Sequence, residues 1–247
     1  MKNPIVKFAE AAIVFGLCMG CASFGSQKAR DLSSHLPLGM VTVVSNYNIY
    51  WEDEDPGVSE WPQKKENPEK TRISRADVLI NDAEAILRQS FADAGITAVA
   101  PKARILESQA YANAKRKRAW NNKSTAIADG YGPVDYGDKK FAAALAEETG
   151  VKAGIYIVFD FSKVMTTGVG KTGYFRAQLY MTVIIVDEKG QILYKKNRFV
   201  SSDDRIRVTL RAFNENELMD LFRTNIANAC YLFIQEFAAL NSLELEK

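Results

Sequence analysis

The segment GIYIVFDFSKV, residues 154–164, is the stretch of sequence that decides the fold. In an extended strand its first half is apolar on both faces, with Ile155, Ile157, Phe159 and Phe161 on one face and Tyr156 and Val158 on the other. A strand that is apolar on both faces lies inside a sheet with other elements packed on both sides. The second face turns polar at Asp160 and Ser162, so we expect the strand to emerge into solvent there.

Further β-rich runs surround this segment. Residues 175–186 predict a strand, residues 187–190 a turn ending in Gly190, and residues 191–200 the returning strand of a hairpin. The β-branched run from Met40 to Tyr47 predicts the first strand, and residues 96–100 predict a short strand stopped by Pro101.

Three amphipathic segments predict helices. The first is bounded by Ser74, which can cap it, and by Gly95, and the second runs from Asp138 to Thr149 before Gly150. A long apolar stripe over residues 217–240 predicts the third. The resulting order is β-α-β-α-β-β-β-α. We therefore expect an α/β class, with a single globular domain over residues 39–247 and a mixed sheet of about five strands with flanking helices.

The N-terminus carries an export signal. Lys2 and Lys7 precede a short apolar run, Ala11–Gly20, which ends at Cys21. This pattern resembles a bacterial lipoprotein signal peptide. The resemblance implies that residues 1–20 are removed and that Cys21 is acylated, for example with palmitate. Residues 21–38 are then the lipidated cysteine and a tether. An uncleaved N-terminal helix is the alternative interpretation.

The signal defines an expected location. Its apolar run is about half as long as the 20 residues that cross a bilayer, so we expect a domain attached to a membrane by lipid rather than inserted in it. Ala22 follows the modified cysteine, and by analogy with enterobacterial sorting this favours the outer membrane, facing the periplasm. Retention at the inner membrane is the alternative.

The element order also resembles a periplasmic α/β domain type, shared by the N-terminal part of TolB, the secretion lipoprotein CsgG and the synthase activator LpoB. The phrases that carry the resemblance are FAAALAEETGV, residues 141–151, and GIYIV, residues 154–158. It implies an envelope protein partner, such as a peptidoglycan synthase or a secretion assembly. No site residues transfer from it, because it contains no functional motif.

Catalytic and cofactor motifs are not evident. Residues 168–172, GVGKT, lack the earlier glycine of a phosphate loop and precede a strand rather than a helix. His35 is the one histidine and lies in the expected tether, and Cys230 lies in an apolar helical stretch typical of a core thiol. The acidic run 52–55 does not have the spacing of a calcium loop. We expect no enzyme activity, cofactor, metal or nucleotide. With a net charge of only +2, we also expect no nucleic-acid partner.

Two groups of residues are candidates for contact with a partner. The first is a basic cluster beside an aromatic residue, suited to an anionic surface or an acidic partner protein, and consists of Lys115, Arg116, Lys117, Arg118 and Trp120. A solvated surface is its alternative explanation. The second is a set of loop aromatics, namely Tyr131, Tyr136, Trp51 and Trp61. A loop folded over the domain with its aromatics buried explains these equally well.

The sequence thus favours a non-enzymatic, membrane-anchored binding or scaffold module for an envelope protein. An oligomeric secretion-channel subunit similar to CsgG is the alternative. Residues 175–186 are long enough to cross a membrane, but Lys195, Lys196 and Arg198 lie in the partner strand of the hairpin. A hydrolase would require a second carboxylate beside Asp160.

Overall fold

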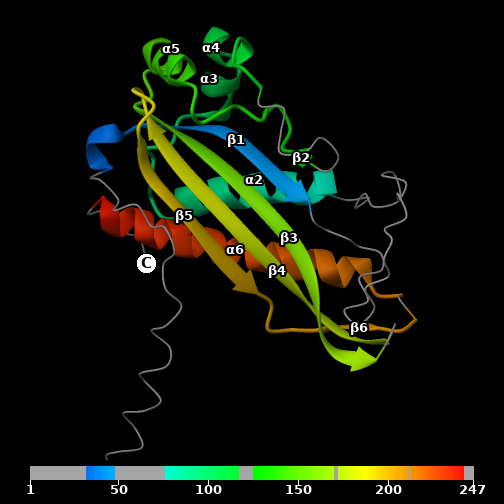
Figure 1. Ribbon diagram of the computed structural model, residues 1–247. Coiled ribbons are helices and arrows are strands. Elements are labelled where there is room, and N and C mark those ends of the chain that lie inside the picture. The colour runs from blue at the N-terminus through cyan, green and yellow to red at the C-terminus, as the bar shows by residue number, and fades with distance from the viewer. Residues whose placement is uncertain (1–31, 48–75, 117–124, 170–171, 211, 242–247) are drawn as a thin grey trace, which may run out of the picture.

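The computed structural model describes residues 32–47, 76–116, 125–169, 172–210 and 212–241. It confirms the α/β class, with helices packed on a six-stranded mixed sheet (Figure 1). The strands are β1 (Leu38–Tyr47), β2 (Thr125–Ile127), β3 (Ala153–Val169), β4 (Thr172–Asp187), β5 (Ile192–Ser201) and β6 (Ile206–Val208). The helices are the 3-10 turn η2 (Ser33–His35), α2 (Ala76–Asp93), α3 (Lys102–Leu106), α4 (Gln109–Ala112), α5 (Lys139–Thr149) and α6 (Glu215–Leu240).

The strand that contains GIYIVFDFSKV lies at the centre of the sheet. The strand order is β2-β1-β3-β4-β5, and β6 adds to β4 outside this path. β1 runs parallel to β3, as expected for strands joined through helices, and β4 pairs antiparallel with both β3 and β5. The β3–β4 pairing continues out to Val169 and Thr172, so the glycine-rich GVGKT stretch joins two strands of a hairpin.

One face of the sheet is covered by α2 and α6, which lie side by side across it (Figure 1). Ile155, Ile157 and Phe159 project from β3 into this layer and are fully buried. Phe91 of α2 packs edge-on against Phe233 of α6, with ring centroids 5.9 Å apart. Each such buried side chain contributes about 1.5–3 kcal/mol relative to an exposed one, so this layer is the main core.

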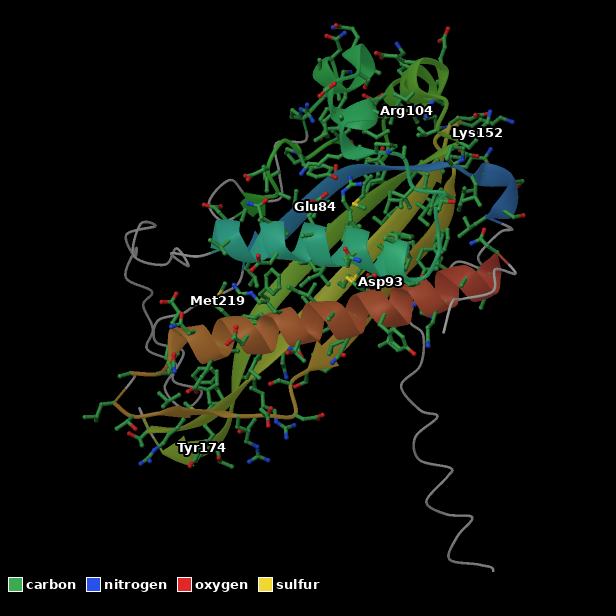
Figure 2. All side chains as sticks on the ribbon, turned by 180° about the vertical axis from the view of Figure 1, so that it is seen from behind. Glu84, Asp93, Arg104, Lys152, Tyr174 and Met219 are labelled. Carbon is green, nitrogen blue, oxygen red and sulfur yellow. The ribbon has the colours of Figure 1, made fainter. Side chains whose placement is uncertain are left out.

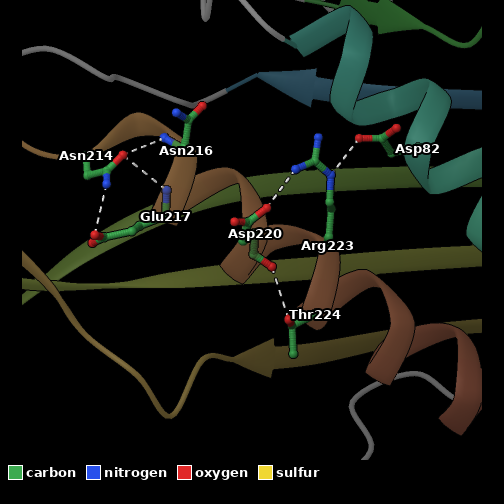
Figure 3. Close-up of polar contacts among 7 residues, drawn as sticks. All are labelled: Asp82, Asn214, Asn216, Glu217, Asp220, Arg223 and Thr224. Carbon is green, nitrogen blue, oxygen red and sulfur yellow. Dashed lines mark hydrogen bonds and ion pairs between the residues drawn. The ribbon is translucent and has the colours of Figure 1, made fainter.

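Polar contacts hold the two long helices together at their solvent side. Arg223 of α6 donates from Nε to Oδ2 of Asp82 in α2 at 2.8 Å, and from Nη1 to Oδ1 of Asp220 at 2.8 Å (Figure 3). Asn214 caps the start of α6: its side-chain oxygen accepts from the backbone N–H groups of Asn216 and Glu217.

Among the described residues, the opposite face is covered at one end by α3, α4, α5 and the loop 129–137 (Figure 1). Phe141 and Leu145 of α5 belong to the same buried cluster as Tyr156 of β3. α5 has the predicted ends: the Asp138 side chain accepts from the N–H groups of residues 140 and 141, and Gly150 ends the helix with a φ of 72°.

Two expectations about the N-terminal half need correction. The predicted strand 96–100 is wrong, because among those residues only Val99 forms a single bridge, to Leu38. The second strand along the chain is instead β2, which pairs antiparallel with β1. The folded domain also includes residues 32–38, which we expected in the tether, since Leu32 is fully buried and Leu38 begins β1.

Candidate functional site

The helices α3–α5 leave part of their face of the sheet uncovered. Beyond that layer, the residues of β3, β4, β5 and β6 on this side are exposed or half-buried. We call this surface the open face. It comprises Asp160, Ser162, Val164, Tyr174, Arg176, Gln178, Tyr180, Thr182, Asn197, Phe199, Ser201 and Arg207.

The middle of the open face carries an aromatic pair. Tyr180 of β4 and Phe199 of β5 lie directly opposite each other, with ring centroids 4.7 Å apart and an interplanar angle of 42°. Tyr180 is 47% exposed and Phe199 49%. Next to them, the hydroxyl of Thr182 donates to Oδ1 of Asn197 at 3.0 Å. Large aromatic side chains that remain half in solvent on the surface of a sheet are typical of protein contact surfaces.

One end of the open face lies where the β3–β4 hairpin is joined by β6. We call this the distal end, formed by Val164, Tyr174, Arg176 and Arg207. Tyr174 pairs directly with Arg207, and Val164 pairs with Arg176. Tyr174 lies at the far end of the molecule from Lys152 and Arg104 (Figure 2).

Asp160 lies where β3 leaves the covered region. It pairs with Tyr180 and is half-buried, whereas Phe159 and Phe161 on the core face are buried. The predicted emergence into solvent at Asp160 and Ser162 is therefore confirmed. A hydrolase would need a second carboxylate beside Asp160, and the described residues of the open face do not provide one.

The predicted basic cluster is described only in part. Lys115 and Arg116 are exposed, while Lys117, Arg118 and Trp120 lie outside the described residues. The guanidinium of Arg116 lies over the ring of Tyr111, 4.4 Å from its centroid, and Nη2 donates to the Tyr111 carbonyl oxygen at 3.0 Å. Arg116 thus packs against the end of α4 through Tyr111.

Tyr131 is buried, as in the alternative of a loop folded over the domain. Its hydroxyl donates to Oε1 of Glu84 at 3.1 Å and accepts from Nη2 of Arg88 at 2.6 Å, both on α2. Burial raises the pKa of this hydroxyl, and Arg88 opposes the rise. Tyr131 therefore fastens the loop 129–137 to α2 and does not present its ring to a partner.

Tyr136 is half-buried and lies at the border of the open face. Its ring packs against Tyr156, with centroids 6.2 Å apart, and Nζ of Lys195 lies 6.0 Å from its centroid. Lys195 projects from β5 on the same side as Phe199. Tyr136 is thus the predicted aromatic that the structure brings nearest to the open face, while Trp51 and Trp61 lie outside the described residues.

The thiol of Cys230 is buried in the core, and burial raises its pKa to about 12. Within the described parts of the chain, no group of His, Cys, Asp and Glu residues is placed to hold a metal ion. None of the helices described there combines the length and apolar character needed to cross a bilayer.

Tyr180 and Phe199 were not identified from the sequence as candidate contact residues, although the pattern of β4 indicates an exposed aromatic. Along β4, buried Phe175, Ala177, Leu179 and Met181 alternate with more exposed residues. This alternation indicates that one face of the strand meets solvent. Tyr180 is a large aromatic residue at one of the exposed positions, and such a residue indicates a contact surface.

Comparisons with known proteins add no family. No protein-family model matches this chain, and no curated protein matches it either.

Proposed function

We propose that this protein is a membrane-anchored lipoprotein of the cell envelope that faces the periplasm and acts without catalysis, as a binding module for another envelope protein. The observation that carries the binding role is the half-exposed pair of Tyr180 and Phe199 on the open face. A surface of this kind exposes apolar area to water, which is unfavourable, and a partner that covers it removes this cost.

The anchor is supported by the sequence. The basic start, the short apolar run and Cys21 together match a lipoprotein signal. From Cys21 to Leu32, where the described fold begins, the chain reaches at most about 40 Å when fully extended. The end of the sheet that carries Leu38 would therefore stay close to the membrane.

A channel subunit is the second candidate, favoured by the length of the β3–β4 hairpin, whose strands have 17 and 16 residues. About 9–11 residues suffice for a membrane-crossing strand. However, Lys196 and Arg198 of β5 both form ion pairs with Glu236 of α6. Membrane insertion of this sheet would break these contacts and expose the charges to lipid, so we rank the binding module first.

Metabolic labelling with palmitate tests the anchor. We expect label in the wild-type protein and none in the Cys21→Ala variant. Label that persists in this variant, or wild-type protein that begins at Met1 and lies in the cytosol, would contradict the anchor.

Crosslinking in intact envelopes, followed by purification, tests the binding role. We expect one major protein partner with the wild type and its loss in the Tyr180→Ala/Phe199→Ala double variant. The matched control is Tyr231→Ala/Leu232→Ala on α6, which removes a similarly exposed apolar pair. Equal loss in both double variants would argue against the open face.

A further inference from the structure

Two arginines lie side by side at the distal end of the open face. Arg207 of β6 is directly opposite Tyr174 of β4, and Arg176 is two residues further along β4 on the same side. Residues in this diagonal relation have Cα atoms about 7–8 Å apart, within reach of long side chains. The distal end thus concentrates two positive charges on one small surface.

Neither guanidinium has an acidic partner among the described residues. Three half-buried arginines elsewhere in the fold do have one: Arg88 pairs with Glu84, Arg198 with Glu236, and Arg223 with Asp82. Nε of Arg176 is buried and has no hydrogen-bond partner in the described part of the chain. Like charges placed together without a counter-charge are destabilising, and an anion bound between them would remove that cost.

Two large apolar side chains adjoin the two arginines on the same face. Tyr174 is 43% exposed and Val164 41%, and both lie on the same face. Arginine and tyrosine are, together with tryptophan, enriched among the residues that contribute most to affinity in protein interfaces. A ligand that fits here combines negative charge with an apolar side chain.

We propose that the distal end binds an acidic segment of the partner protein. Carboxylates of that segment take the hydrogen bonds that Arg176 and Arg207 offer, and a neighbouring apolar side chain packs on Val164 and Tyr174. This inference rests on the proposed function, since it names the chemistry of the partner that the open face receives.

The position of the distal end favours a protein over an anionic lipid surface. At about 3.3 Å per residue, the 17 residues of β3 span about 55 Å from the Leu38 end to the hairpin. The described chain begins at Leu32, close to the Leu38 end. Lys152 lies at that same end, where its N–H donates to the carbonyl of Pro37, and Tyr174 lies at the far end of the molecule from Lys152 (Figure 2). An anchored domain can therefore hold the arginines far from its own membrane.

Binding of a fluorescein-labelled random copolymer of glutamate and tyrosine, measured by fluorescence anisotropy, tests this proposal. The protein used is the full chain with Cys21→Ala, so that no acyl chain contributes. We expect saturable binding that weakens with added salt. The Arg176→Gln/Arg207→Gln variant should bind at least about tenfold more weakly, because two charge-assisted contacts are lost.

The matched control is Lys140→Gln/Lys189→Gln, which removes the same charge from exposed positions near the other end of the sheet. It should bind like the parent chain, and circular dichroism should show that both double variants are folded. The same proteins are also mixed with vesicles of phosphatidylcholine, with and without phosphatidylglycerol.

Three outcomes would overturn the inference: no binding of the copolymer, equal weakening in both double variants, or arginine-dependent binding to the anionic vesicles instead of the copolymer. If the arginine variant still captures the envelope partner while Tyr180→Ala/Phe199→Ala does not, the binding role stands and the acidic partner is wrong. Loss of the partner in neither variant would count against the proposed function itself.

Discussion

Tyr180 and Phe199 are cross-strand neighbours whose rings touch, yet each keeps nearly half of its surface in water. The cause is the length of the strands compared with the layer that covers them. The buried cluster that contains α5 residues ends, on this face, with Ile184 and Val186 of β4. Further along β4, positions on the same face such as Tyr180 and Tyr174 are exposed. The two aromatics therefore stabilise the pairing of β4 and β5 and still remain available to a partner.

The first prediction separates binding from folding. Tyr180→Ala/Phe199→Ala should lower the free energy of unfolding by only about 1 kcal/mol, the usual size of a cross-strand aromatic contact. Leu179→Ala, which empties a fully buried site on the adjacent residue, should cost about 2–5 kcal/mol. Urea unfolding measures both. A loss of several kcal/mol in the double variant would mean that the pair belongs to the core.

The second prediction concerns the link between β5 and α6. Burial opposes ionisation of Glu236, but hydrogen bonds from Lys196 and Arg198 and their charges outweigh it and lower the pKa below its ordinary value of 4.5. The unfolded carboxylate then takes up a proton more readily than the folded one. The contribution of Glu236 to stability is therefore present above the ordinary pKa and is lost as the pH falls through the lowered pKa.

Glu236→Gln should accordingly reduce stability at neutral pH by about 1 kcal/mol or less, because the ion pairs are partly exposed. The difference from the wild type should vanish in acid. Urea titrations at neutral pH and at a pH below the lowered pKa check this. A difference that grows in acid would contradict the assigned direction of the pKa shift.

The third prediction concerns the buried thiol. In a Cys18→Ser/Cys21→Ser chain, Cys230 is the one remaining cysteine. Because its pKa is raised to about 12 and its side chain is fully buried, it should react with a thiol reagent at mildly alkaline pH at least about a hundredfold more slowly in the native state than in urea. Similar rates in the two states would show that the helix α6 does not seal the core.

The fourth prediction concerns a strained turn next to β6. Leu210 has a φ of 51° and is 78% exposed, and its backbone N–H donates to the hydroxyl of Thr172 at 3.2 Å. A leucine in the left-handed region costs about 1 kcal/mol, and asparagine tolerates that region better. Leu210→Asn should therefore raise the melting temperature by a few degrees, whereas Leu210→Ala, which keeps the strain, should not. Destabilisation by asparagine would show that the leucine side chain contributes contacts that outweigh the strain.

Much of the fold could be predicted because its signals are local. Asp138 and Gly150 mark the ends of α5 by capping chemistry, and the apolar residues on both faces of the 154–164 stretch identify the central strand. The short pieces between α2 and α5 could not be predicted. α3, α4 and β2 have three to five residues each, and their conformations depend on packing against distant segments.

The candidate site was predictable only in outline. The change from apolar to polar residues at Asp160 and Ser162 indicated where β3 meets solvent, and the structure agrees. The partners of Tyr131 could not be read from the sequence, because Glu84 and Arg88 lie more than 40 residues away along the chain. Likewise, the meeting of Tyr180 with Phe199 depends on the register between β4 and β5.

Photocrosslinking in living cells tests the central claim most directly. A photoreactive phenylalanine analogue is placed at Tyr180 on the open face or, as a control, at Tyr231, which is 59% exposed on α6. The account predicts that position 180 forms a crosslink to one envelope protein and position 231 does not. Equal crosslinking from both positions, or none from position 180 in a folded and palmitoylated protein, would contradict it.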